Sequence, residues 1–336
     1  MDNRLTKKRI SDLLSYEWIF MIVVCVISIV FLELAYAFGS VKLTAGQHFR
    51  YYFDYTIYPT SNTDLKRELV YKNTFSYDIL KLSSEAISQD YNVLADRLSI
   101  QEGDVIFTDV VGLDKYKEVV AKGEIPEARV RAFSIIDTID YKIASIDVML
   151  ENAKKYLEDN FFDDDYNQAT DGYGSGNIDD AKVRSVFLSR NGSDNRFRTT
   201  DSINQGVEQE KARIVKLCEN VVFMQDFIDN PDNSDAIIRY TKHSQNFEFT
   251  KNSLPNNYQT WMQNEIAQGR GDDVYAINLG KLMGGKNISN FMQYKLGDDL
   301  NDIVVMAFEF TSYQPHLQYE SLSFICSTIK ICTGIE

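Results

Sequence analysis

Residues 90–109, with the sequence DYNVLADRLSIQEGDVIFTD, decide the fold of this chain. The apolar residues of 90–100 recur at helical spacing, and the residues QEG at 101–103 end that helix. The run DVIFTD at 104–109 predicts a short buried strand. Because residues 75–82 predict a strand before the helix, the stretch has the order strand, helix, strand. That order is typical of a βαβ unit with parallel strands and a right-handed crossover.

Strands and helices alternate along much of the remaining sequence, which predicts an α/β fold with a parallel sheet. Residues 163–177 are acidic and rich in glycine, and they predict a surface loop. We expect strands at 48–58, 183–188, 274–279 and 303–310, and helices at 66–71, 115–123, 141–161, 201–228 (with Asp201 as its N-cap), 258–268 and 317–332.

Residues 18–38, WIFMIVVCVISIVFLELAYAF, predict one transmembrane helix. At a rise of about 1.5 Å per residue, this stretch spans a hydrocarbon core of about 30 Å. Trp18, Ile19 and Phe38 mark its ends. Residues 1–17 carry four of the basic groups, so they are expected in the cytoplasm, and residues 39–336 are expected to form an extracytoplasmic domain of a single-pass cell-membrane protein.

The same residues also fit a secretory signal peptide, with Ala35-Tyr36-Ala37 as an A-x-A cleavage site. Glu33 favours cleavage, because a carboxylate in hydrocarbon is costly, although it lies near the outer end of the span. The length of the basic segment favours an uncleaved anchor. We prefer the anchor, and both alternatives stay open.

The composition narrows the choice of partners. The chain has a formal net charge of −14, and its first 38 residues contribute none of it, so the outer domain is acidic. This charge argues against binding nucleic acid or anionic lipid, both of which attract basic proteins. Cys326 and Cys332 are six residues apart in a predicted helix and point to different sides. Together with Cys218, they are expected to be buried, inert thiols rather than a disulfide framework.

Two stretches resemble a known family: residues 90–109, with LADRLS and GDVIFTD, and residues 314–320, QPHLQYE. They resemble extracellular solute-binding proteins of ABC importers, in particular short membrane-anchored relatives of bacterial sugar-binding proteins. The resemblance implies a periplasmic-binding-protein-like fold of two small lobes. It also implies the membrane subunits of an ABC importer as partners. No ligand-contact motif of the family can be transferred residue by residue.

Aromatic, carboxyl and amide side chains suggest where a sugar ligand would bind. Sugar sites combine flat aromatic faces with groups that hydrogen-bond hydroxyls, and ligands of parallel sheets lie beyond the carboxyl ends of the strands. Trp261 could stack on a sugar, although packing in the core is the simpler role for it. The other residues expected near such a cleft are Tyr55, Tyr58, Asp109, Tyr313 and Gln314.

The sequence contains no recognisable catalytic motif, and its three histidines, His48, His243 and His316, are widely separated. We expect neither an enzyme nor a cofactor. A weak calcium candidate exists at Asp171, Ser175 and Asp179, where Gly176 has the position of the EF-hand glycine. The twelfth position of that loop is Lys182 instead of the usual glutamate, so a solvated loop is the preferred interpretation.

The sequence therefore predicts a membrane-anchored, extracytoplasmic solute-binding-like protein that accompanies an ABC importer, with carbohydrate as the candidate ligand. The alternative is an extracytoplasmic adaptor or sensory module that keeps the fold, has lost the ligand, and acts through protein contacts. An enzyme would need a paired-carboxylate site, and the sequence does not identify one.

Overall fold

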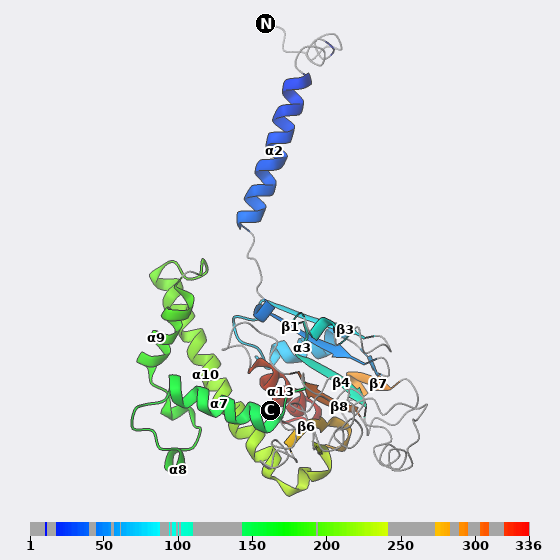
Figure 1. Ribbon diagram of the computed structural model, residues 1–336, viewed down its shortest axis with the longest axis vertical. Helices are drawn as coiled ribbons and strands as arrows, with labels where there is room; N and C mark the ends of the chain where they lie inside the picture. The colour runs from blue at the N-terminus through cyan, green and yellow to red at the C-terminus, as the bar shows by residue number, and fades with distance from the viewer. Residues whose placement is uncertain are drawn as a thin grey trace, which may run out of the picture. The chain divides into compact units, whose positions relative to one another are not determined.

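The computed structural model describes residues 11, 18–39, 45–54, 57–60, 62–87, 94, 96–98, 100, 102–109, 143–192, 194–240, 273–282, 289–294, 303–308 and 319–335. The chain divides into two compact units, Met1–Leu43 and Thr44–Glu336. Figure 1 shows the helix of the first unit, α2, and the sheet and helices of the second.

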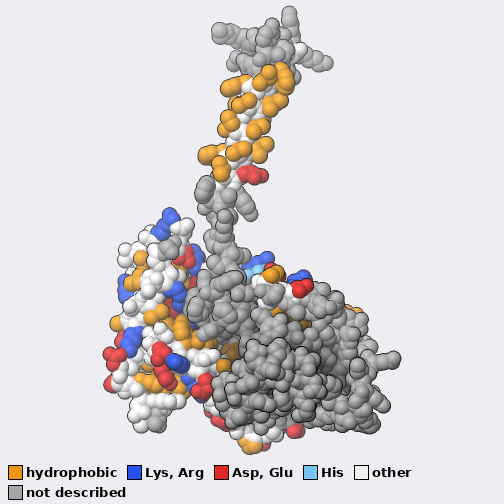
Figure 2. Space-filling view, viewed as in Figure 1, with side chains coloured by type: hydrophobic (Ala, Val, Ile, Leu, Met, Phe, Trp, Pro, Cys, Tyr) orange, Lys and Arg blue, Asp and Glu red, His pale blue; other side chains and the backbone are white. Residues whose placement is uncertain are grey.

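Helix α2 runs over Trp18–Gly39, and Glu33 is its only charged residue. Its described side chains, at residues 18–34, are all exposed, and apolar side chains cover most of the face of the helix that Figure 2 shows. Within the described part of the chain, no helix combines the length and the apolarity of a membrane span. The transmembrane anchor therefore stays a prediction.

A six-stranded sheet organises the second unit, with the strand order β3-β1-β4-β8-β6-β5. Its strands are β1 (His48–Phe53), β3 (Lys81–Ala86), β4 (Val105–Asp109), β5 (Ile237–Tyr240), β6 (Asp273–Asn278) and β8 (Ile303–Ala307). Strands β3, β1 and β4 are parallel, whereas β8, β6 and β5 join through antiparallel pairs. The α/β class is confirmed, but the expected parallel sheet is wrong for half of the strands. Antiparallel neighbours need no helical crossover. The alternation of strands and helices in the sequence therefore does not show which strands are antiparallel.

The sequence predicts a βαβ unit over residues 75–109, and its two strands, β3 and β4, are parallel but not neighbours, because each pairs with β1 between them. The βαβ unit with neighbouring strands lies earlier in the chain, where β1 is followed by α3 (Asn62–Tyr71) and then by β3. Strand β4 matches the predicted strand closely, and Gly103 before it has a φ of 123°, which suits glycine. The predicted strand at 75–82 is wrong in position, because β3 begins only at Lys81. A short separate pair joins β2 (Ile57–Pro59) to β7 (Met292–Tyr294).

Side chains alternate between two buried faces of the sheet. In β1, Tyr51 and Phe53 belong to the larger core, whereas Tyr52 between them belongs to the smaller core on the other face. Strand β8 repeats the pattern, with Val305 in the larger core and Met306 in the smaller one. Because both faces of the sheet are buried, the sequences of these strands are apolar at nearly every position.

Helices α7 (Ile146–Asn160), α9 (Asp180–Asn191), α10 (Thr200–Asp229) and α13 (Glu320–Thr333) supply the partner surface of the larger core. Helix α7 packs against β6, and α13 packs against β8 and α3. The long α10 contacts α7, α9 and α13 (Figure 1). It therefore connects the helices that touch the sheet with α9.

Several local predictions need correction. Residues 183–188 belong to helix α9 instead of a strand, because Val183 and Phe187 bury one helical face and Asp179 caps the helix. The N-cap of α10 is Thr199, not Asp201, and it forms a capping box with Ser202. The loop at 163–177 contains the short helices α8 (Gln168–Asp171) and η3 (Ser175–Asn177). The helices expected at 115–123 and 258–268 lie outside the described residues.

Candidate ligand-binding pocket

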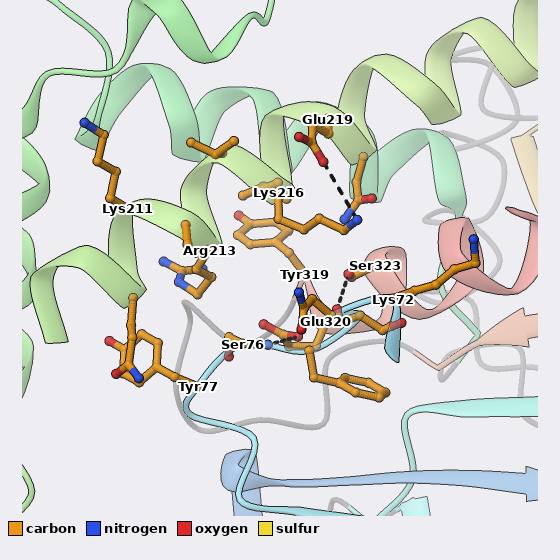
Figure 3. Close-up of a pocket in the computed structure, with 18 of the residues that line it drawn as sticks. Lys72, Ser76, Tyr77, Lys211, Arg213, Lys216, Glu219, Tyr319, Glu320 and Ser323 are labelled. Atoms are coloured by element: carbon orange, nitrogen blue, oxygen red, sulfur yellow. Dashed lines mark hydrogen bonds and ion pairs between the residues drawn. The ribbon is translucent and has the colours of Figure 1, made fainter. Parts of the chain in front are cut away.

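A pocket of about 630 Å³ lies between α10, α13 and the turn that follows α3. Figure 3 shows Arg213, Lys216 and Glu219 reaching into it from α10, opposite Ser76 on the turn and Glu320 on α13. The apolar face of α10 brings these groups together. Ile214, Leu217 and Val221 are buried in the larger core and fix the rotation of the helix. The pocket is therefore built on three packed elements.

A buried ion network forms one end of this pocket and is centred on Glu210, which is fully buried. Arg190 donates from Nη1 to Glu210 Oε1 (3.0 Å) and from Nη2 to Oε2 (2.7 Å). Arg213 donates from Nε to Oε2 (3.1 Å) and from Nη2 to Oε1 (2.8 Å). Burial opposes ionisation of Glu210, but the two arginines hold its pKa well below the ordinary value.

Tyr77 and Asp78 connect the network to the turn after α3. The Tyr77 hydroxyl donates to Glu210 Oε2 at 3.1 Å and accepts from Arg190 Nη2 at 2.7 Å. Asp78 is also buried, and its Oδ1 accepts from Arg196 Nη2 at 2.6 Å. Burial and the neighbouring carboxylates raise the pKa of Tyr77, so its hydroxyl stays protonated. The network consequently locks α9, α10 and the turn together.

Glu320, the first residue of α13, supplies a second buried carboxyl group to the pocket. Its Oε2 accepts from the backbone N–H of Ser76 at 3.1 Å. Burial raises the pKa of Glu320 to about 7, although the charge of Arg213 pulls it down. Glu320 thus changes charge near neutral pH, unlike Glu210.

Three buried polar atoms in the pocket wall lack a hydrogen-bond partner among the described residues: Thr74 Oγ1, Ser76 Oγ and Asn220 Oδ1. Thr74 and Asn220 are the most deeply buried residues of the three, at only 2% and 1% exposed. An unsatisfied buried polar atom costs about 1–3 kcal/mol, and each such atom calls for an explanation. Because all three residues line a cavity large enough for a small molecule, a bound molecule can supply the missing bonds.

The cationic side chains of the pocket differ in their partners. Lys211 is paired with Asp180 at 2.7 Å, and Lys72 Nζ donates to the Ile335 carbonyl at 3.2 Å. Lys216 Nζ forms an ion pair with Glu219 Oε2 at 3.8 Å, a distance too long for a hydrogen bond.

Most residues predicted for a sugar site cannot be compared with this pocket. Tyr55, Trp261, Tyr313 and Gln314 lie outside the described residues. Asp109 ends β4, but its side chain is not among the described ones. Tyr58 is 52% exposed in β2 and does not line the pocket.

The carboxyl ends of β1 and β4 bring together two polar residues, Asp54 and Thr108, which are not among those predicted for a sugar site. The buried Asp54 follows β1, and its Oδ2 accepts from Thr108 Oγ1 at 2.7 Å. The backbone N–H of Asp54 also donates to the Phe107 carbonyl at 2.9 Å. These contacts tie the ends of the two strands together.

The calcium candidates have other partners. Asp171 accepts from the Asn167 N–H (2.7 Å) and the Thr170 hydroxyl (2.8 Å). Asp179 caps α9 through the Ala181 N–H at 2.7 Å. Among the described residues, no group of three or more His, Cys, Asp or Glu side chains could hold a metal ion.

Sequence reasoning missed the ion network and the pocket, although the sequence holds a signal for part of them. Glu210 and Arg213 fall within the apolar stripe of α10, between Val207 and Leu217. A carboxylate and a guanidinium at core positions predict a buried pair, since buried charges need partners. Glu320 gives no comparable signal, because acidic residues are common in the first turn of a helix.

No match appears when the chain is compared with protein-family models, curated proteins and solved structures.

Proposed function

We propose that this chain is a membrane-anchored, extracytoplasmic solute-binding protein that serves an ABC importer. The pocket between α10, α13 and the turn after α3 is its ligand site. The observation that carries the proposal is the set of unpartnered buried atoms in the wall of a pocket of about 630 Å³, of which Thr74 Oγ1 and Asn220 Oδ1 belong to the most deeply buried residues. A domain without a ligand would gain stability by replacing such groups with apolar ones.

The resemblance of residues 90–109 and 314–320 to solute-binding proteins supports the importer as partner and a periplasmic-binding-protein-like fold of two small lobes. The apolar sequence of residues 18–38 supports the anchor. Binding in this class involves no bond chemistry, which agrees with the absence of a recognisable catalytic motif from the sequence. Neighbouring genes for importer permeases would further support the assignment.

A ligand screen tests the proposal. The full chain, purified in detergent, is screened by thermal shift against neutral sugars, acidic sugars and peptides. A solute bound at one hundred times its Kd adds about 2.7 kcal/mol of stability, so a binder is expected to raise Tm by several degrees. No shift with any solute would overturn the proposal and favour the adaptor alternative.

A pocket-filling variant locates the binding. Ala212 lines the pocket from an exposed position of α10, so Ala212→Trp is expected to block the site without unfolding the domain. Val222→Trp is the matched control, because Val222 is 41% exposed on the same helix and does not line the pocket. The ligand-induced rise in Tm should disappear in Ala212→Trp and persist in Val222→Trp.

A labelling experiment tests the topology. Cys218, Cys326 and Cys332 are buried, so a cysteine introduced at the exposed Ser175 would be the accessible thiol of the second unit. On intact cells, a membrane-impermeant maleimide should label Ser175→Cys and leave Ser11→Cys unlabelled. Labelling of Ser11→Cys alone would place the large domain in the cytoplasm and contradict the proposal.

A further inference from the structure

We infer that the pocket takes a small hydroxylated anion of the sugar-acid class, with its carboxylate at Lys216 and its hydroxyl groups at Asn220 and Thr74. This inference rests on the proposed function and narrows the class of solute.

Lys216 is the pocket cation best placed to receive an anion. Its ammonium group carries three donors, and Glu219 lies too far away, at 3.8 Å, for a hydrogen bond. The side chain of Glu219 is also 55% exposed, so solvent screens the attraction between the two. Arg213, by contrast, already gives two bonds to Glu210 and a third to the Tyr156 hydroxyl at 3.0 Å.

Other cations lie near Lys216. Lys72 lines the same pocket, whereas Lys330 on α13 is outside its lining, with Nζ 4.6 Å from the centre of the Phe223 ring. Burial lowers the pKa of Lys330, the charges of Lys216 and Lys72 lower it further, and the charge of Glu219 raises it. Because Glu208, Glu219 and Glu320 also line the pocket, the carboxylate site depends on Lys216 itself and not on a positively charged lining.

The unpartnered atoms define the rest of the ligand. Asn220 Oδ1 is an acceptor and needs a donor, whereas the Thr74 hydroxyl can donate or accept. Hydroxyl groups on the ligand satisfy both. Asn220 follows Lys216 by four residues on α10, so the two side chains start roughly 6 Å apart on one face of the helix. A single six-carbon sugar acid can bridge that distance, whereas acetate has no donor for Asn220 Oδ1.

Calorimetry on the full chain in detergent tests the assignment with three probes: D-glucuronate, D-glucose and acetate. Glucuronate is expected to bind more tightly than glucose, and acetate only weakly. Lys216→Met should weaken glucuronate binding about tenfold or more and leave the affinity for glucose unchanged, since hydrogen bonds to charged groups are the strong ones. Lys216→Arg should keep most of the affinity. Lys155→Met is the matched control and should bind like the wild type, because Lys155 is exposed on α7 and does not line the pocket.

The outcomes separate this inference from the proposed function. Equal affinity for glucose and glucuronate, or an unchanged affinity in Lys216→Met, would overturn the anionic class while leaving solute binding intact. Binding of acetate as tight as that of glucuronate would overturn the roles of Asn220 and Thr74. The Tm of each variant is also measured without ligand. An unchanged Tm shows that a loss of affinity comes from the binding site and not from unfolding of the domain. If no solute raises Tm in the wider thermal-shift screen, the proposed function itself is wrong.

Discussion

Arg213 and Glu210 lie one turn apart on α10 and form a two-point ion pair inside the protein, at 3.1 Å and 2.8 Å. Their side chains are only 5% and 0% exposed. Such a pair contributes little net stability when it is intact, because both charges have lost their hydration. Breaking it is costly, since one partner then remains buried and unpaired. Loss of either partner is therefore expected to destabilise the domain.

Glu210→Gln should destabilise the domain by about 3–5 kcal/mol, because it leaves Arg190 and Arg213 facing a neutral group in the interior. The measurement is urea unfolding of the full chain. Glu208→Gln provides the control, because Glu208 is exposed on the same helix and its replacement should change stability by less than about 0.5 kcal/mol. Equal effects of the two changes would show that the network is not structurally important.

Glu320 should make stability fall as pH rises. Burial raises its pKa from the ordinary value of 4.5 to about 7 in the folded protein, so between these pH values the folded state holds a proton that the unfolded state has released. Over this window the loss should reach about 3 kcal/mol. We expect Tm to be lower at about pH 8 than at about pH 5, and Glu320→Gln to reduce this difference. If Tm falls equally with pH in the wild type and in Glu320→Gln, Glu320 is not the group responsible for the pH dependence.

Gly206 should be required where α9 packs on α10. A Cβ atom at this position would lie 2.8 Å from Phe197 Cε1 and 2.9 Å from Phe187 Cε2. Gly206→Ala is therefore expected to lower Tm, although alanine alone would favour the helix by about 1 kcal/mol. Gly176→Ala, where the added atom meets nothing within 4 Å, should leave Tm nearly unchanged. A gain in Tm for Gly206→Ala would mean that both rings can move aside.

The cysteines of the second unit should be unreactive. Cys218, Cys326 and Cys332 are buried, and burial raises the pKa of each thiol to about 12. Thiolates are the reactive form, so a thiol reagent should modify these groups only after the domain unfolds. Mass spectrometry after mild and denaturing labelling provides the check. Rapid modification of the folded domain would show that at least one thiol is accessible.

Features that depend on neighbouring residues in the sequence could be predicted, whereas features that depend on the packing of distant segments could not. Strands β4 and β8 and helix α10 were predicted closely because continuous apolar runs and a helical stripe carry strong local signals. The helix at 183–188 was missed because its caps and its short apolar face resemble a strand between loops. The direction of β8 relative to β4 has no local signature at all.

The candidate pocket was harder to foresee than the fold. Glu320, Asn220 and Thr74 come from three distant segments, and only packing brings them to one cavity. Nothing in their immediate sequence distinguishes them from ordinary polar residues. The unpaired state of Asn220 Oδ1 and Thr74 Oγ1 is a property of the folded protein alone.

The central position of β8 has a consequence for biosynthesis. This strand is the last of the sheet to leave the ribosome, yet it lies between β4 and β6. Until it emerges, those two strands expose unpaired edges that are prone to wrong pairing. Helix α13, which supplies Glu320 to the pocket, follows later still. A nascent chain would therefore need protection from aggregation until most of this length is made, and the candidate pocket would be completed last.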